Sequence, residues 1–157
     1  MKRFPAEVIR AQIRSVLGAW GFPDDHAETS SEIMTETDLR GVDSHGISML
    51  ASYEKQIAKG HIRVGGEVRL VRETASTALF DAGGGLGHPV SVRAMNLAVD
   101  KCLESGVAVV TVRNSSHFGA AGAYSAIAAR RGCIGMVTSA TRGVLMVPTF
   151  GAEAVMG

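Results

Sequence analysis

The spacing of apolar residues predicts that residues 1–62 form a helical N-terminal subdomain. Between residues 5 and 20, apolar side chains recur at three- and four-residue intervals, which is typical of an amphipathic helix. A second helix is expected over 24–39, because two aspartates open this segment where a helix favours negative charge. A third helix is expected over 47–59, with its apolar residues on one face.

The pattern changes in residues 63–157, which are predicted to form an α/β domain. Apolar residues alternate or run together at strand length in 68–72 and 77–80, which favours an antiparallel pair of strands. The run 107–112 is almost continuously β-branched, as in a strand that is buried on both faces. The other expected elements are helices over 89–104 and 120–131 and a buried strand over 134–138. The expected fold class is therefore α/β (α+β), with a helical part followed by a mixed sheet.

The order of elements also suggests where a ligand would bind. The strand 107–112, the helix 120–131 and the strand 134–138 would form a βαβ unit. Ligands of open α/β sheets bind beyond the carboxyl ends of the strands. His117 lies just beyond the first of these strands, so we expect it to face a ligand.

Two short segments carry the candidate chemistry. They are Asp38-Leu-Arg-Gly-Val-Asp-Ser-His-Gly46 and Arg113-Asn-Ser-Ser-His-Phe-Gly119. Each places a histidine next to a glycine or one residue away from it. Histidine exchanges protons near neutral pH, and glycine allows tight turns and close ligand approach. We interpret His45 and His117 as a proton-transfer site that folding brings together.

Composition narrows the possible partners and compartment. The chain has 157 residues, a net charge of +1 and no stripe of basic residues, so we expect neither nucleic acid nor an anionic membrane as its partner. No apolar stretch is long enough for a transmembrane helix, and the N-terminus has no apolar signal region. Cys102 and Cys133 are predicted to be buried free thiols, which fits a cytoplasmic location.

Two other kinds of site are weaker interpretations. The glycine-rich stretch 83–87 precedes a helix but lacks the Gly-x-Gly-x-x-Gly spacing and the later acidic residue of a Rossmann fold, so we interpret it as a turn. Asp43, His45 and His117 could form a two-histidine, one-carboxylate metal set, although no helical pair of ligands supports it. We therefore expect no metal.

The remaining histidines are interpreted as structural. His26 and His61 are expected to be exposed, at a helix start and in a turn. His88 is expected to cap the helix that follows the glycine-rich stretch.

The two histidine segments, together with Tyr53 and Val147-Pro-Thr-Phe-Gly151, resemble the malate/L-lactate dehydrogenase type 2 family. The resemblance runs from about residue 5 to residue 157. It implies a non-Rossmann α/β fold and a homodimer with active sites near the subunit interface. It also implies hydride transfer between NAD or NADP and the 2-carbon of a small 2-oxo or 2-hydroxy acid.

The resemblance also implies roles for individual residues. His45 and His117 become the catalytic acid/base candidates, and family members differ over which is the principal one. Ser44 and Tyr53 would shape the substrate pocket. The segment from Ser139 to Thr141 would contact the cofactor.

The sequence departs from the family pattern in two respects. Many members have an arginine four residues after the first histidine, suited to a substrate carboxylate, where this chain has Met49. Family chains also continue well past the equivalent of Gly157, so the α/β domain is expected to be truncated at its C-terminus. The alternative function is accordingly a truncated, non-catalytic domain that acts only in folding or oligomerisation.

Overall fold

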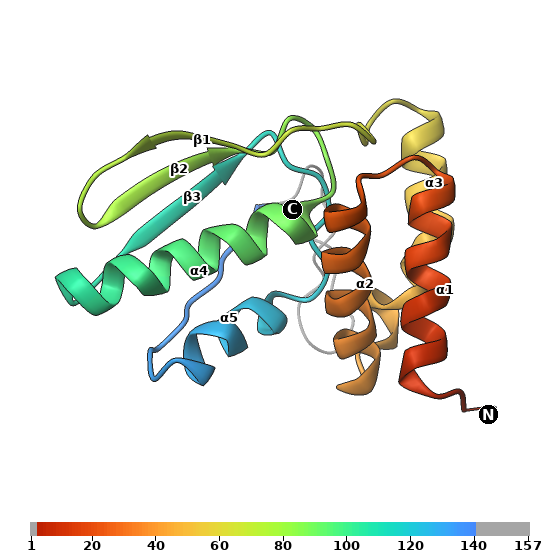
Figure 1. Ribbon diagram of the computed structural model, residues 1–157, viewed down its shortest axis with the longest axis horizontal. Helices are drawn as coiled ribbons and strands as arrows, with labels where there is room; N and C mark the ends of the chain where they lie inside the picture. The colour runs from red at the N-terminus through yellow and green to blue at the C-terminus, as the bar shows by residue number, and fades with distance from the viewer. Residues whose placement is uncertain (1–2, 141–157) are drawn as a thin grey trace, which may run out of the picture.

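A computed structural model describes residues 3–140 as a mixed α/β structure. The helices are α1 (Ala6–Ala19), α2 (Asp24–Leu39), α3 (Leu50–Ala58), α4 (Gly87–Ser105) and α5 (Ala121–Arg130), with two 3-10 turns, η1 (Asp43–His45) and η2 (Ile47–Met49). The strands are β1 (Arg69–Glu73), β2 (Thr77–Asp81) and β3 (Val109–Arg113). Figure 1 shows α1, α2 and α3 gathered at one end of the molecule and the sheet at the other. The expected helices are confirmed within a few residues.

The three strands form one sheet in the order β1-β2-β3. β1 and β2 pair antiparallel, as predicted, whereas β2 and β3 pair parallel with Thr77 opposite Val109. The connection between the parallel strands is α4, so the βαβ unit of the described chain is β2–α4–β3. The carboxyl ends of β2 and β3 therefore lie at the same edge of the sheet.

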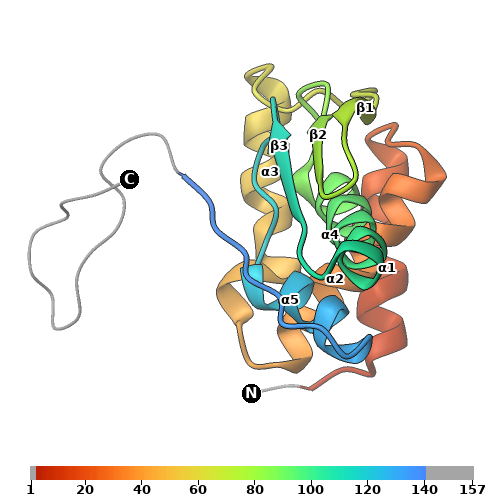
Figure 2. The same ribbon diagram turned by 90° about the vertical axis from the view of Figure 1, so that its left-hand side faces the viewer.

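Helix α4 covers one face of the sheet, as Figures 1 and 2 show from two directions. The side chains between them form an apolar cluster of Val68, Phe80, Ala82, Val90 and Ala94, against which Leu97, Val110 and Val112 pack. A parallel pair needs such a cover, because its crossover connection places a helix on the sheet face.

The expectation that strand 107–112 is buried on both faces is wrong for the described residues. Val107 and Val109 are 66% and 58% exposed, while Val110 and Val112 face α4. β3 is an edge strand of the described sheet, and its Val109 face carries no cover there. The β-branched run reports strand propensity correctly, but it does not report how many faces are covered.

The expected strand 134–138 is also wrong, because these residues form no strand. Ile134 and Met136 are almost completely exposed. Gly135 instead lies so close to α5 that a Cβ there would collide with the Ala128 side chain and the Ser125 backbone. A strand forms only where a neighbouring backbone accepts its hydrogen bonds, and this segment runs along a helix.

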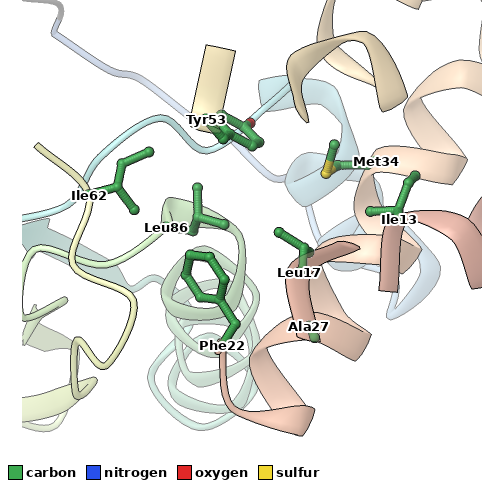
Figure 3. Packing of buried hydrophobic residues seen from close by; sticks show 8 residues of the cluster. All are labelled: Ile13, Leu17, Phe22, Ala27, Met34, Tyr53, Ile62 and Leu86. Atoms are coloured by element: carbon green, nitrogen blue, oxygen red, sulfur yellow. The ribbon is translucent and has the colours of Figure 1, made fainter. Parts of the chain in front are cut away.

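A second apolar cluster holds the three N-terminal helices together. Figure 3 shows its eight buried side chains, which are Ile13, Leu17, Phe22, Ala27, Met34, Tyr53, Ile62 and Leu86. Leu86 comes from the glycine-rich segment before α4 and lies in the middle of this view. The helical part and the α/β part therefore meet at Leu86.

Two further observations concern the described residues as a whole. None of their helices is both long and apolar enough to cross a membrane. Cys102 and Cys133 are free thiols, as predicted, but they are half-buried rather than fully buried.

Candidate functional site

The first histidine segment is held by an aspartate from the end of α2. The Ile47 backbone N–H donates to Asp38 Oδ2 at 2.9 Å, which satisfies the first free N–H of η2. Gly46 lies between them, and a Cβ at this position would overlap the Asp38 carboxylate. The glycine beside His45 therefore serves a close approach between two parts of the segment.

His45 itself is half-exposed at the end of η1. Its Nδ1 lies 2.8 Å from Ser44 Oγ, so the neighbouring hydroxyl orients the imidazole ring. Ser44 is exposed. Its position in the structure is thus compatible both with orienting His45 and with contacting a small ligand.

The second histidine segment is held by the glycine-rich stretch. The Gly84 N–H donates to the Asn114 carbonyl at 2.8 Å, and the Gly87 N–H donates to the His117 carbonyl at 2.9 Å. Between them, Ser116 bonds to the Gly85 carbonyl through both its N–H and its hydroxyl. The stretch is therefore a backbone support for the His117 segment, more than the simple turn expected from the sequence.

Small residues are needed where these two stretches meet. A Cβ on Gly87 would lie 2.5 Å from Phe118 Cβ and 2.8 Å from the Ser116 carbonyl oxygen. Phe118 stacks on Tyr124 of α5, whose hydroxyl donates to the Phe118 carbonyl. The segment that carries His117 is thus clamped from both sides.

Folding brings His45 and His117 together. Their ring centroids are 5.4 Å apart with an angle of 30° between the planes. His45 comes from η1 and His117 from the segment beyond the carboxyl end of β3. The juxtaposition that the sequence predicts for these two residues is therefore present in the structure.

Tyr53 joins this pair from α3. It is 1% exposed, and its hydroxyl lies 2.8 Å from His117 Nδ1. The same hydroxyl is 3.5 Å from Nε2 of His88, in the first turn of α4. Four aromatic side chains from four segments thus form one connected group: His45, Tyr53, His88 and His117.

Burial alters the titration of three members of this group. It lowers the pKa of His88 to about 3, with a smaller contribution from His117. It also lowers the pKa of His117, and the neighbouring His45 adds to this effect. The pKa of the Tyr53 phenol is raised well above its ordinary value by burial. His88, His117 and Tyr53 are therefore uncharged at neutral pH.

Sequence reasoning missed the place of His88. It was expected to cap α4, but no side-chain hydrogen bond caps this helix, and the ring is completely buried beside Tyr53. Its Nδ1 has no hydrogen-bond partner in the described structure. The adjacent Gly87 is its one mark in the sequence, and this alone does not distinguish a buried site histidine from a helix-capping one.

The other predicted residues are placed as follows. Ser139 is exposed near the end of the described chain, and Thr141 lies outside the described residues. Met49 is half-buried and packs against the helical cluster, so its side chain belongs to the core.

A metal site and other ligand sites are the remaining candidates within residues 3–140. No group of three or more His, Cys, Asp and Glu side chains there is arranged to hold a metal ion. Two grooves on the described helices lie elsewhere, one lined by residues of α2, α4 and α5 and one between α1 and α2. Neither groove is lined by a member of the histidine group.

Comparison with known proteins places this arrangement in context. The sequence profile described as malate/L-lactate dehydrogenase matches residues 4–157. Malate dehydrogenase of Pyrococcus horikoshii is 37% identical over 155 residues, which are 99% of this chain and 43% of that protein. L-sulfolactate dehydrogenase of Methanothermobacter thermautotrophicus is 35% identical over 157 residues, or 100% of this chain and 46% of that one.

Solved structures agree with the sequence matches. Malate dehydrogenase from Pyrococcus horikoshii superposes with a TM-score of 0.78 at 37% identity, over 83% of this chain and 38% of that chain. Malate dehydrogenase from Entamoeba histolytica gives a TM-score of 0.80 at 35% identity, over 84% and 37%. The chain thus spans less than half the length of the proteins that it matches.

Proposed function

Because the chain belongs to the malate/L-lactate dehydrogenase family, we propose that it carries the proton-transfer part of a hydroxyacid dehydrogenase. The reaction is hydride transfer between NAD or NADP and the 2-carbon of a small 2-oxo or 2-hydroxy acid. The observation that supports this most directly is the pairing of His45 with His117. We assign these two residues as the catalytic acid/base candidates.

The chemistry of the group fits carbonyl reduction. A nicotinamide cofactor, when bound, would supply the hydride, and the carbonyl oxygen of the substrate would gain negative charge. A histidine within hydrogen-bond reach stabilises that charge and supplies the proton, and in the reverse direction it removes the proton from the hydroxyl. The two imidazole rings, 5.4 Å apart, allow one histidine to donate while the other orients the oxygen.

The cofactor contact that we propose lies at Ser139 and Thr141, and the glycine-rich stretch does not contribute to it. The three glycine N–H groups at 83–85 already have acceptors inside the protein. The first donates to the Asp81 carboxylate, and the next two donate to the carbonyls of Asn114 and Ala82. Amides that are already paired cannot cradle a phosphate as the glycines of a dinucleotide-binding loop do.

Ser44 and Tyr53 shape the substrate pocket in this proposal, Ser44 by direct contact and the buried Tyr53 through His117. Ser44 is exposed beside His45, and the Tyr53 hydroxyl holds His117. Met49 packs into the helical core and has no charge, so the cation that pairs with a substrate carboxylate must come from another position. We therefore propose a 2-oxo or 2-hydroxy acid as the substrate class and leave its side group open.

A homodimer would complete the site. The histidine group is not enclosed by either of the grooves in the described structure, yet hydride transfer needs a pocket that excludes water. A second copy of the chain, placed near the His45–His117 pair, would supply part of the wall of such a pocket.

The proposal is tested by binding first and by turnover second. Reduced-nicotinamide fluorescence is followed while the chain is titrated with NADH and with NADPH. If cofactor binds, a panel of 2-oxo acids is reduced by the wild type and by His45→Ala and His117→Ala. We expect the rate to fall roughly 100-fold or more in the variant that lacks the principal acid/base.

His61→Ala is the matched control, because His61 is exposed and bonds to Gln56, away from the histidine group. It should leave the rate unchanged. No binding at about 1 mM of either cofactor would favour the alternative, in which the chain acts only in folding or oligomerisation. Unchanged rates in both site variants would refute the assignment of His45 and His117.

A further inference from the structure

We propose that His88 is a positioning residue for His117, acting through the Tyr53 hydroxyl to fix which ring nitrogen of His117 carries the proton. This inference rests on the proposed role of His117 in proton transfer. It deepens that role, because a histidine can donate to a substrate oxygen only from a nitrogen that holds a hydrogen.

The first step concerns Nδ1 of His117. The Gly119 backbone N–H points at this atom from 3.3 Å. A backbone N–H can only donate, so Nδ1 is the acceptor and carries no hydrogen. The single proton of the neutral His117 ring is then on Nε2, the nitrogen on the opposite side of the ring.

The second step concerns the Tyr53 hydroxyl, 2.8 Å from the same Nδ1. Because Nδ1 of His117 accepts, the hydroxyl must donate to it. The oxygen of Tyr53 is then left with lone pairs and no hydrogen to offer elsewhere.

The third step concerns His88. Its Nε2 is 3.5 Å from the Tyr53 oxygen, with the two rings nearly perpendicular at 72°. Since the oxygen can only accept from this side, His88 donates from Nε2–H. Both hydrogen bonds then run in the same direction, from His88 to Tyr53 and from Tyr53 to His117.

Packing fixes His88 in this orientation. The ring is completely buried, and Gly119 lies so close that a Cβ there would be 3.0 Å from its Nε2. Its Nδ1 has no partner among the described residues. The interaction with Tyr53 is thus the only polar contact that the described structure gives this ring, and burial keeps the ring neutral.

The opposite arrangement is less well satisfied. If His117 carried its proton on Nδ1, that nitrogen would donate to Tyr53 and the Gly119 N–H would lose its acceptor. The Tyr53 hydrogen would turn to His88, which would need its own proton on the unpartnered Nδ1. The donor at His88 therefore adds to the Gly119 N–H in favouring the tautomer of His117 that presents Nε2–H.

The test is an NMR measurement of histidine tautomers, which needs neither cofactor nor substrate. The chain is labelled with ¹⁵N-histidine, and long-range ¹H–¹⁵N spectra distinguish Nδ1–H from Nε2–H in each neutral ring. In the wild type we expect both His88 and His117 to carry the proton on Nε2. In His88→Phe, which keeps a ring but has no donor, the ratio of Nε2–H to Nδ1–H at His117 should fall about fivefold, the effect of losing one neutral hydrogen bond.

His88→Gln is the conservative variant, because its amide nitrogen can replace Nε2 as the donor to Tyr53. It should retain the wild-type tautomer of His117, which a merely space-filling role for His88 does not predict. His61→Gln, at an exposed histidine, should change the tautomer of neither His88 nor His117.

Three results would overturn the inference. They are an Nδ1–H tautomer at His117 in the wild type, an Nδ1–H tautomer at His88, and an unchanged His117 ratio in a folded His88→Phe variant. The first two need no variant, so a His88→Phe chain that fails to fold leaves the test decisive. If the wild-type chain shows no dehydrogenase activity but has the expected tautomers, the proposed function is contradicted and the tautomer assignment still holds.

Discussion

The two histidine segments are built in opposite ways. The His45 segment is held by its own neighbourhood: Ser44 is adjacent, and Asp38 bonds to Ile47 only nine positions away. The His117 segment is held by distant parts of the chain. Its support comes from the glycine-rich stretch 31 positions earlier and from Tyr53, 64 positions earlier.

The two histidines are therefore suited to different tasks in a paired site. In the proposed function, the locally held and half-exposed His45 is the member of the pair that can adjust to a ligand. His117 is also half-buried, but contacts from Tyr53 and Gly119 on one ring nitrogen fix its orientation. Preorganised donors of this second kind stabilise developing charge without rearrangement.

Breaking the long-range support of the His117 segment should destabilise the fold most. In Gly87→Ala, the new Cβ would collide with Phe118 and with the Ser116 backbone, neither of which is a flexible chain end. We expect a loss of about 3 kcal/mol of unfolding free energy, measured by urea denaturation. Gly122→Ala is the control, because its Cβ meets nothing within 4 Å and alanine favours a helix. Equal stability of the two variants would contradict the close contact at Gly87.

A smaller effect is expected from acid. The folded-state pKa of His88 is lowered to about 3, while an unfolded histidine titrates near 6.5, so only the unfolded chain takes up this proton as the pH falls between these values. The contribution of His88 to the unfolding free energy is therefore fully present above the unfolded pKa and is lost as the pH falls below it. His88 contributes a loss of about 2 kcal/mol between about pH 7 and pH 5, and His117, whose pKa is also lowered, acts in the same direction.

His88→Gln removes the contribution of His88 and should flatten the pH dependence of the unfolding free energy by that amount. Tyr53 contacts His88, and His117 influences its pKa; both residues remain in the variant. His61→Gln should leave the pH dependence as in the wild type, because His61 is exposed. An unaltered slope in His88→Gln would mean that His88 is protonated in the folded protein.

The smallest effect is expected from the local support. Asp38→Ala removes the acceptor of the Ile47 N–H and should cost about 1–2 kcal/mol of unfolding free energy. It should also loosen the His45 ring while the His117 segment keeps its amide protection in hydrogen exchange. Asp38→Asn keeps an acceptor oxygen and should lose less than half as much. Loss of protection at His117 would show that the two segments are not supported independently.

Most helices and the antiparallel strand pair could be predicted, because their signals are local. The apolar spacing of 5–20 and the aspartates at 24 and 25 suffice for α1 and α2. The two errors, at 107–112 and 134–138, have a common cause. Whether Val109 is covered and whether Ile134 pairs depend on neighbours far away in the sequence, which composition and periodicity do not report.

The same limit applies to the site. His45 and His117 could be found because each stands in a short polar, glycine-containing segment. The part played by His88 could not, since its contact with Tyr53 spans 35 positions and a buried histidine resembles a helix-capping one in sequence. Whether Ser139 and Thr141 contact a cofactor stays a prediction.

Leu86 connects the two halves of the molecule in a way that bears on cooperativity. Its neighbours Ala82 and Val90 belong to the cluster under the sheet, whereas Leu86 is buried among the three N-terminal helices. Opening one apolar cluster displaces the backbone of residues 82–90, and this displacement also disrupts the other cluster, because both clusters include side chains from this segment. We infer that the described fold melts as one unit. A substitution deep among the N-terminal helices would then lower the fraction of molecules that possess a histidine site, without changing the chemistry of those that do.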